Sequence, residues 1–111
     1  MPEHTPPRVK PPKPFREFVK QYPGVAEAYE SLGEAVRAAG PLTPREVALV
    51  KLALSVGARM EGSTHAHTRK ALAAGFDTAA VEQVAPLACP TIGFPNMMAA
   101  LTWVRDVTAP D

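Results

Sequence analysis

The stretch TPREVALVKLALSVGARMEGSTHAHTRKALAAG, residues 43–75, decides the fold, because its local signals begin and end two consecutive helices. Thr43 stands at an N-cap position, Pro44 at the first helical position and Glu46 at the third. Together these three residues form the pattern of a capping box. We therefore predict a helix from Pro44 to about Ala58.

This predicted helix is apolar on nearly every side, since only Lys51 and Ser55 interrupt a run of Val, Ala and Leu. The two polar residues are one turn apart and share a face. Such a composition is typical of a buried central helix. After a break bracketed by Gly57 and Gly62, we predict a second helix from about Ser63 to Ala74.

Glycine and proline mark the ends of the other predicted helices. Gly40 and Gly75 stand where a helix end favours a left-handed residue. Pro23 is expected to stop the first helix, Pro86 to kink the fifth, and residues 90–94 to form a loop. The remaining helical patterns cover residues 15–20, 25–39, 78–89 and 95–107.

The apolar content of the chain indicates self-association. Its 111 residues suffice for one domain, and 46% are apolar although only 6% are aromatic. Helices that are apolar on more than one side bury the extra side against a partner. The helix at 25–39 carries one apolar stripe: Val25, Ala28, Tyr29, Leu32, Ala35, Val36 and Ala39. We predict an all-α bundle of about six helices that forms a homo-oligomer.

The first fourteen residues differ in composition from the rest. Residues 1–14 hold six of the thirteen prolines and several cations, which predicts an extended basic arm, and residues 15–111 are expected to form a single helical domain. The net charge of +1 gives no field for nucleic acid. The sequence shows no leader pattern and no apolar run long enough to span a membrane, so we expect a protein that binds no membrane. A single cysteine, Cys89, fits a reducing compartment, and we expect the cytoplasm.

The order of segments over residues 42–107 resembles the carboxymuconolactone decarboxylase and alkylhydroperoxidase AhpD family. A capped apolar helix (TPREVALVKLALSVGAR) is followed by a polar segment with a histidine (MEGSTHAH) and an Ala-rich helix closed by Gly (TRKALAAG). An acid-containing helix (FDTAAVEQV) and a Gly-Pro turn (IGFPNMMAAL) complete the order. The resemblance implies an AhpD-like helical bundle, a homo-trimer or hexamer, and decarboxylase or peroxiredoxin-type chemistry.

The cysteine pair of the peroxidase branch is missing. Aligned on His67, the two cysteine positions hold Met60 and Ser63, and the position of that branch's acid holds Ala48. Peroxide reduction needs a low-pKa thiolate and a second thiol that resolves the sulfenic acid. Cys89 lies outside the segment, so we expect AhpD-type peroxidase activity to be lost.

The decarboxylase branch resembles this chain in keeping the histidine without thiols, which makes lyase-type chemistry the first hypothesis. Arg59 and Glu61 match the residue types of that branch but not its register. We predict acid/base catalysis by His67, assisted by Glu61 and His65, on a small anionic or carbonyl substrate. A cation at Lys51 would suit an anionic substrate.

Helix geometry leaves two interpretations of His67 open. In the first interpretation His67 is catalytic, and Ser63, one turn earlier on the same face, is a candidate for substrate binding. Lys51 and Arg59 are further candidates for substrate binding. In the competing interpretation, Ser63 merely satisfies the hydrogen bonding of a partly buried imidazole. His65 lies about 200° away from His67 around the helix, which argues against a shared metal, and we expect no cofactor. A non-catalytic scaffold or ligand-binding protein is the second hypothesis.

Overall fold

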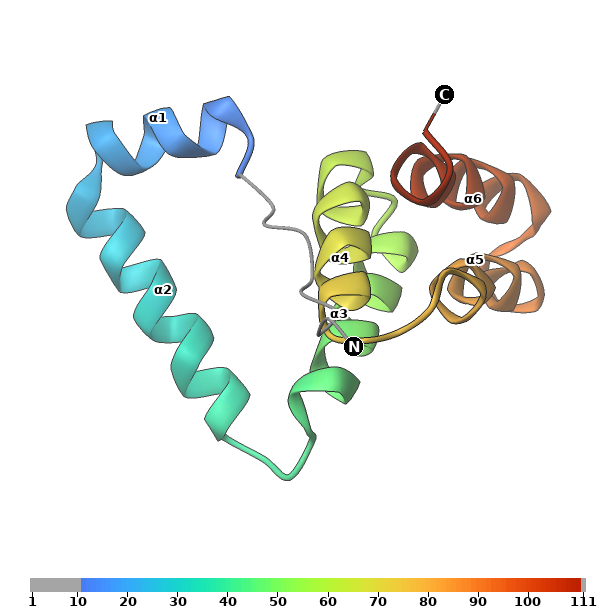
Figure 1. The fold of residues 1–111 in the computed structure, drawn as a ribbon, viewed down its shortest axis with the longest axis horizontal. Helices are drawn as coiled ribbons and strands as arrows, with labels where there is room; N and C mark the ends of the chain where they lie inside the picture. Colours follow the sequence, from blue (N-terminus) through green and yellow to red (C-terminus); the bar gives the residue numbers. More distant parts are fainter. Residues whose placement is uncertain (1–10, 111) are drawn as a thin grey trace, which may run out of the picture. The chain divides into compact units, whose positions relative to one another are not determined.

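The computed structural model describes residues 11–110 and contains six α-helices and no β-strand within that range (Figure 1). The all-α prediction is confirmed. The helices belong to two compact units: α1 and α2 form one, and α3 to α6 form the other. Whether residues 15–111 act as a single domain stays a prediction. In the described part of the chain, no helix is both long and apolar enough to cross a membrane.

The smaller unit consists of α1 (Lys13–Gln21) and α2 (Pro23–Ala38). Residues 1–10 of the predicted arm lie outside the described residues. The arm was expected to end at residue 14, but α1 already begins at Lys13. Pro14 fits there because the first turn of a helix needs no backbone donor. Pro23 does not simply stop α1, because it occupies the first turn of α2.

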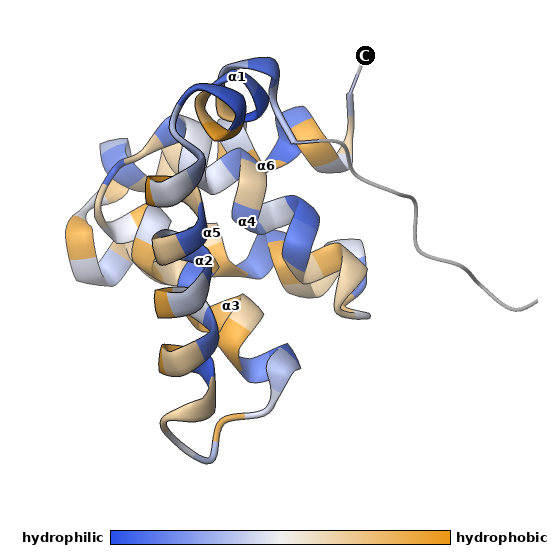
Figure 2. Cartoon of the chain, turned by 90° about the vertical axis from the view of Figure 1, so that its left-hand side faces the viewer, coloured by the Kyte–Doolittle hydropathy of each residue, from blue (hydrophilic) through white to orange (hydrophobic). Residues whose placement is uncertain are grey.

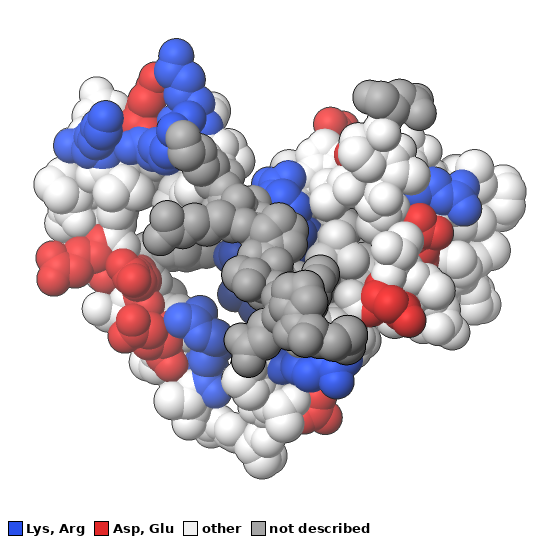
Figure 3. Space-filling model, viewed as in Figure 1, with Lys and Arg blue, Asp and Glu red and all other residues white. Residues whose placement is uncertain are grey.

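Neither α1 nor α2 contains a buried residue. Val25, Tyr29, Leu32 and Val36 follow the helical repeat on one side of α2 and are 58–67% exposed. Figure 2 shows hydrophobic residues on one side of α2 and hydrophilic residues on the other. Basic side chains gather on α1 and acidic ones along α2 (Figure 3). Nothing within this unit covers the apolar stripe.

The larger unit consists of α3 (Pro44–Gly57), α4 (Glu61–Ala73), α5 (Thr78–Ile92) and α6 (Phe94–Thr108). α3 packs against α4, α5 packs against α6, and further contacts join α4 to α6 and α3 to α5. All four helices contribute to one apolar core. Its buried members are Leu52, Val56, Ala71, Val81, Ala85, Ala100 and Val104.

The prediction that α3 is a buried central helix holds for only one side of the helix. Leu52, Ser55 and Val56 are buried, whereas Val50 and Leu54 on the other sides are exposed. A four-helix unit of this size covers only one face of each helix. α3 therefore presents an apolar side outside the core.

Two helix ends differ from the predictions. α5 continues through Pro86 and Pro90 to Ile92, because each proline removes only its own donor and Gly93, at φ 98°, is the residue that ends the helix. Gly40 is not left-handed; α2 ends at Ala38, and the N–H of its C-cap residue, Ala39, donates to the carbonyl of Val36. Gly75, at φ 103°, follows the prediction.

Candidate functional site

A buried hydroxyl contact sets the register between α3 and α4. The hydroxyl of Thr64 donates to the Ser55 hydroxyl at 3.3 Å, and Ser55 in turn donates to the carbonyl of Leu52 at 2.7 Å. The two helices are joined by a three-residue connection and run in opposite directions (Figure 1). One turn back on α3 from Ser55 is Lys51, and one turn on along α4 from Thr64 is Thr68. With this register, Lys51 on α3 is near enough to His67, the neighbour of Thr68, for its charge to lower the pKa of His67.

His67 is half-buried on α4, and its ring is not fully hydrogen-bonded. Its Nδ1 atom is buried and has no hydrogen-bond partner. Burial lowers the pKa of His67 below its ordinary value near 6.5, and the charges of Lys70 and Lys51 lower this pKa further. The imidazole is therefore neutral at neutral pH.

The competing interpretation of His67, in which Ser63 satisfies the ring, is not supported at Nδ1. Ser63 is half-buried one turn earlier on α4, but Nδ1 receives no hydrogen bond from it. An unpaired buried polar atom costs about 1–3 kcal/mol relative to a paired one, so a purely structural role gives no reason to keep it. This orphaned nitrogen is the most informative feature of the site.

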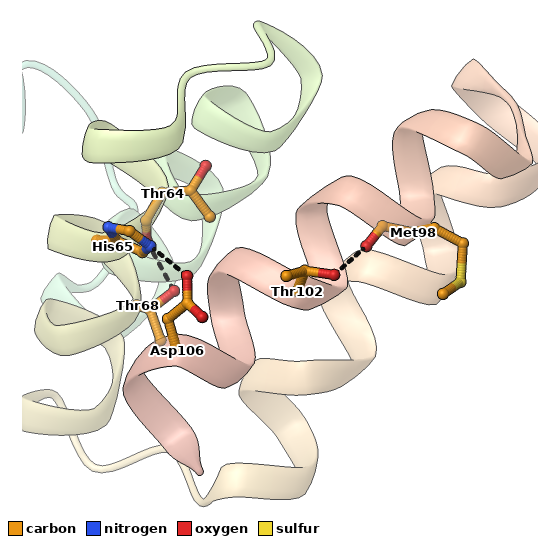
Figure 4. Close-up of polar contacts among 6 residues, drawn as sticks. All are labelled: Thr64, His65, Thr68, Met98, Thr102 and Asp106. Carbon is orange, nitrogen blue, oxygen red and sulfur yellow. Dashed lines mark hydrogen bonds and ion pairs between the residues drawn. The ribbon is translucent and has the colours of Figure 1, made fainter. Parts of the chain in front are cut away.

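His65 points away from His67. Its Nε2 lies 2.9 Å from Oδ2 of Asp106 on α6 (Figure 4). Because the two histidines occupy opposite sides of α4, the structure does not bring His65 to the imidazole it was expected to assist. Asp106 was missed by the sequence analysis, since it is 41 residues away from His65 and no local pattern links the two.

Glu61 and Arg59 lie at the start of α4, outside the core. Glu61 is the first residue of α4, which begins two residues earlier than predicted because Met60 adopts an extended conformation and its carbonyl accepts the first helical bond. Arg59 has a left-handed backbone with φ 60°. Both side chains are exposed, and neither forms an ion pair or hydrogen bond with His67 in the described part of the chain.

The remaining polar residues fit structural roles. Glu46 completes the predicted capping box: its carboxylate accepts from the Thr43 N–H at 2.9 Å, which lowers its pKa. Cys89 is a free, half-buried thiol on α5. Among residues 11–110, no group of three or more His, Cys, Asp or Glu side chains is arranged to hold a metal ion.

Fold and site together define an all-helical protein with a neutral, half-buried histidine beside two lysines and no thiol pair. The chain belongs to the carboxymuconolactone decarboxylase family, whose model matches residues 23–106. This match runs from the start of α2 to near the end of α6 and therefore covers the whole candidate site.

A relative in Haemophilus influenzae, described only as an uncharacterized protein, is 39% identical over 59 residues. These residues make up 53% of this chain and 52% of the relative, so the chain spans about half the length of the curated relative it matches. No solved structure gives a significant match.

Proposed function

We propose that this chain carries out thiol-independent acid/base chemistry of the decarboxylase or lactone type on a small anionic or carbonyl substrate, with His67 as the group that exchanges a proton with it. The observation that carries the proposal is the buried, unpartnered Nδ1 of an imidazole whose pKa is lowered by burial and by the charges of Lys70 and Lys51. Perturbed titratable groups with unmet hydrogen bonds cluster at functional sites.

The surroundings of His67 suit such a substrate. Lys51, whose charge acts on His67, would provide positive charge for a substrate carboxylate or a developing enolate oxygen. The Ser63 hydroxyl, one turn before His67, is placed to contact a polar substrate atom. Arg59 and Glu61 are proposed as contacts at the entrance, because both are exposed next to the start of α4.

The test is turnover of a panel of lactones and β-keto acids by the wild-type chain and by His67→Ala. We expect the variant to lose roughly 100-fold to 10,000-fold in rate, which is the range that general acid/base groups contribute. His65→Ala is the matched control, because it removes the histidine on the opposite side of α4 and should leave most of the rate intact. Equal rates in His67→Ala and the wild type, with unchanged circular dichroism, would refute the proposal.

A second candidate function, a non-catalytic oligomeric scaffold, is favoured by one specific observation. The apolar stripe of α2 is exposed and its unit has no buried residue, so the unit lacks a core of its own. We propose that the stripe packs against a second copy of the chain in a trimer or hexamer. The basic α1 and acidic α2 provide complementary charge for such packing. Wild-type turnover would decide against a purely structural role.

Two further expectations belong with this proposal. Peroxide reduction of the AhpD type is not expected, because Met60 and Ser63 carry no thiol and Cys89 lies on a different helix. A reducing compartment such as the cytoplasm suits a chain whose one cysteine is free. Peroxide consumption by the reduced protein that is abolished in Cys89→Ser would contradict the first expectation.

A further inference from the structure

The exposed apolar residues of α2 follow a strict seven-residue repeat. Alternating steps of three and four residues join six of them, which together form the seam of α2: Tyr22, Val25, Tyr29, Leu32, Val36 and Ala39. All six are exposed, and the first and last are the N-cap and C-cap residues of α2. An average step of about 3.5 residues keeps a second helix in contact along the whole length of the first. The seam is therefore suited to another helix.

The positions along both edges of the seam carry no charge. Ala26 and Gly33 lie along one edge, and Ala28 and Ala35 lie along the other. In many paired helices these edge positions hold the charged residues that choose a partner. Here they hold small residues, and the three glutamates of α2 lie farther round the helix. A partner helix thus meets an apolar surface that allows the two backbones to approach closely.

The seam is complementary to itself when two copies of α2 run in opposite directions. Placing Tyr29 opposite Leu32 of the second copy also brings Tyr22 opposite Ala39, because the second helix is read in reverse order. Each tyrosine then faces a smaller side chain. A parallel pair would instead set each tyrosine against the same tyrosine of the second copy and Ala39 against Ala39, so that crowded layers would alternate with a gap. Side-chain size therefore favours the antiparallel pair.

The charge of α1 favours the same direction. α1 carries Lys13, Arg16 and Lys20 against Glu17, so the segment that precedes α2 is positively charged. In a parallel pair the two basic segments would start side by side and repel each other. In an antiparallel pair they start at opposite ends of α2, roughly 24 Å apart, which is more than a Debye length. Each then starts beside the C-terminal end of the other α2, where the helix dipole favours cations.

We propose that two copies of the chain pair through their α2 seams in antiparallel orientation, about a two-fold axis that passes between Tyr29 and Leu32. The inference rests on the self-association proposed above and names the surface that covers the apolar side of α2, which is the same side of a second copy. Such a contact uses one surface twice and closes on itself. It joins the chains in pairs, so it selects the hexamer, built from three pairs, over the trimer.

Cross-linking of single-cysteine variants tests this orientation. The proposed pairing sets Val25 opposite Val36 of the second copy, whereas the two Val25 residues lie about 16 Å apart along the helices. Val25→Cys and Val36→Cys are made in the full chain together with Cys89→Ser, which removes the natural thiol. A short bismaleimide is added to each variant alone and to the two variants co-expressed. We expect several-fold more covalent dimer from the co-expressed pair than from either variant alone.

Two further variants identify what lies against the seam. Glu27→Cys, outside the seam, is the matched control and should give no dimer with Val36→Cys. Val50→Cys lies on the exposed side of α3. A dimer between Val25→Cys and Val50→Cys, with none between Val25→Cys and Val36→Cys, would place α3 against the seam and overturn the proposal. A dimer from Val25→Cys alone, with none from the co-expressed pair, would show a parallel arrangement and overturn it as well.

The mass of the assembly gives an independent readout. Light scattering of the wild-type chain should give an even number of subunits, and a trimer would overturn the pairing. An assembly in which none of the cysteine pairs cross-links would also overturn it, while self-association itself would stand. A chain that stays monomeric would refute both. The chemistry proposed for His67 is decided separately, by turnover in His67→Ala.

Discussion

Two histidines placed two residues apart on α4 have opposite environments. His65 is paired with a carboxylate on α6, and His67 faces α3 with a buried nitrogen that has no partner. A histidine paired with a carboxylate near the surface is a common structural feature worth about 1 kcal/mol or less. The buried, unpartnered Nδ1 of His67 costs stability, and the proposed substrate contact would give a reason to keep it. The same residue type therefore carries two different roles on one helix turn.

The lowered pKa of His67 makes stability depend on pH. Because the pKa of this group in the folded protein lies below its unfolded value near 6.5, the unfolded chain binds more protons below that pH. The contribution of His67 to stability is thus present above pH 6.5 and is lost as pH falls through the folded pKa. We expect His67→Gln to flatten this part of the unfolding profile measured by denaturant titration. A profile with unchanged slope in His67→Gln would contradict the prediction.

Arg59 provides a second prediction at this scale. It adopts φ 60° at the end of α3, where its N–H and that of Met60 bond back to Val56 and Ser55. Gly75 occupies the same position after α4, at φ 103°. We expect Arg59→Gly to raise the free energy of unfolding by roughly 1 kcal/mol, because a left-handed conformation costs a side chain about this much. Gly75→Ala, as the matched test, should lower it by a similar amount.

At the scale of elements, helix ends are set by local chemistry. The capping box of α3 forms as the sequence predicts, and the Asp77 side chain accepts from the N–H of Ala80 to cap α5. The pKa of Glu46 is lowered by the Thr43 N–H and hydroxyl. The hydrogen bond from the Thr43 N–H to the Glu46 carboxylate is therefore strong at neutral pH and weakens as pH falls through the folded pKa of Glu46.

The Thr43 hydroxyl can be tested directly. We expect Thr43→Ala to reduce the free energy of unfolding by about 1 kcal/mol, because the N–H of Glu46 loses its acceptor. Thr43→Ser keeps the oxygen and should stay near the wild type. Chemical denaturation followed by circular dichroism gives both values. Equal losses in the two variants would show that the methyl group and not the cap is responsible.

At the scale of the whole molecule, the apolar surface exceeds what the described helices cover. The stripe of α2 and the exposed Val50 and Leu54 of α3 are both outside the buried core. Large exposed apolar patches mark interaction sites in proteins. The proposed homo-oligomer gives these surfaces a partner.

Self-association through α2 has a direct test. We expect the wild-type chain to elute as a multiple of the monomer in size-exclusion chromatography with light scattering. Leu32→Glu places a charge in the stripe and should shift the protein towards the monomer, whereas Glu27→Gln, outside the stripe, should not. A monomeric wild-type chain at all concentrations would refute the assembly.

The amino-acid sequence by itself determined the helical class and the cap of α3, because these depend on residues within one or two turns of each other. The family followed from the order of segments along residues 42–107. It also singled out His67, Ser63 and Lys51. The end of α5 was misjudged because proline disturbs only the turn before it, and the helix continued.

Only the tertiary structure decided how these residues are grouped. The pairing of His65 with Asp106 spans 41 residues, and the approach of Lys51 to His67 depends on how α3 packs against α4. The orphaned Nδ1 is likewise a consequence of packing, because burial is set by what neighbouring helices cover. Local spacing cannot encode such contacts, since helices that are joined by short loops can meet in more than one register.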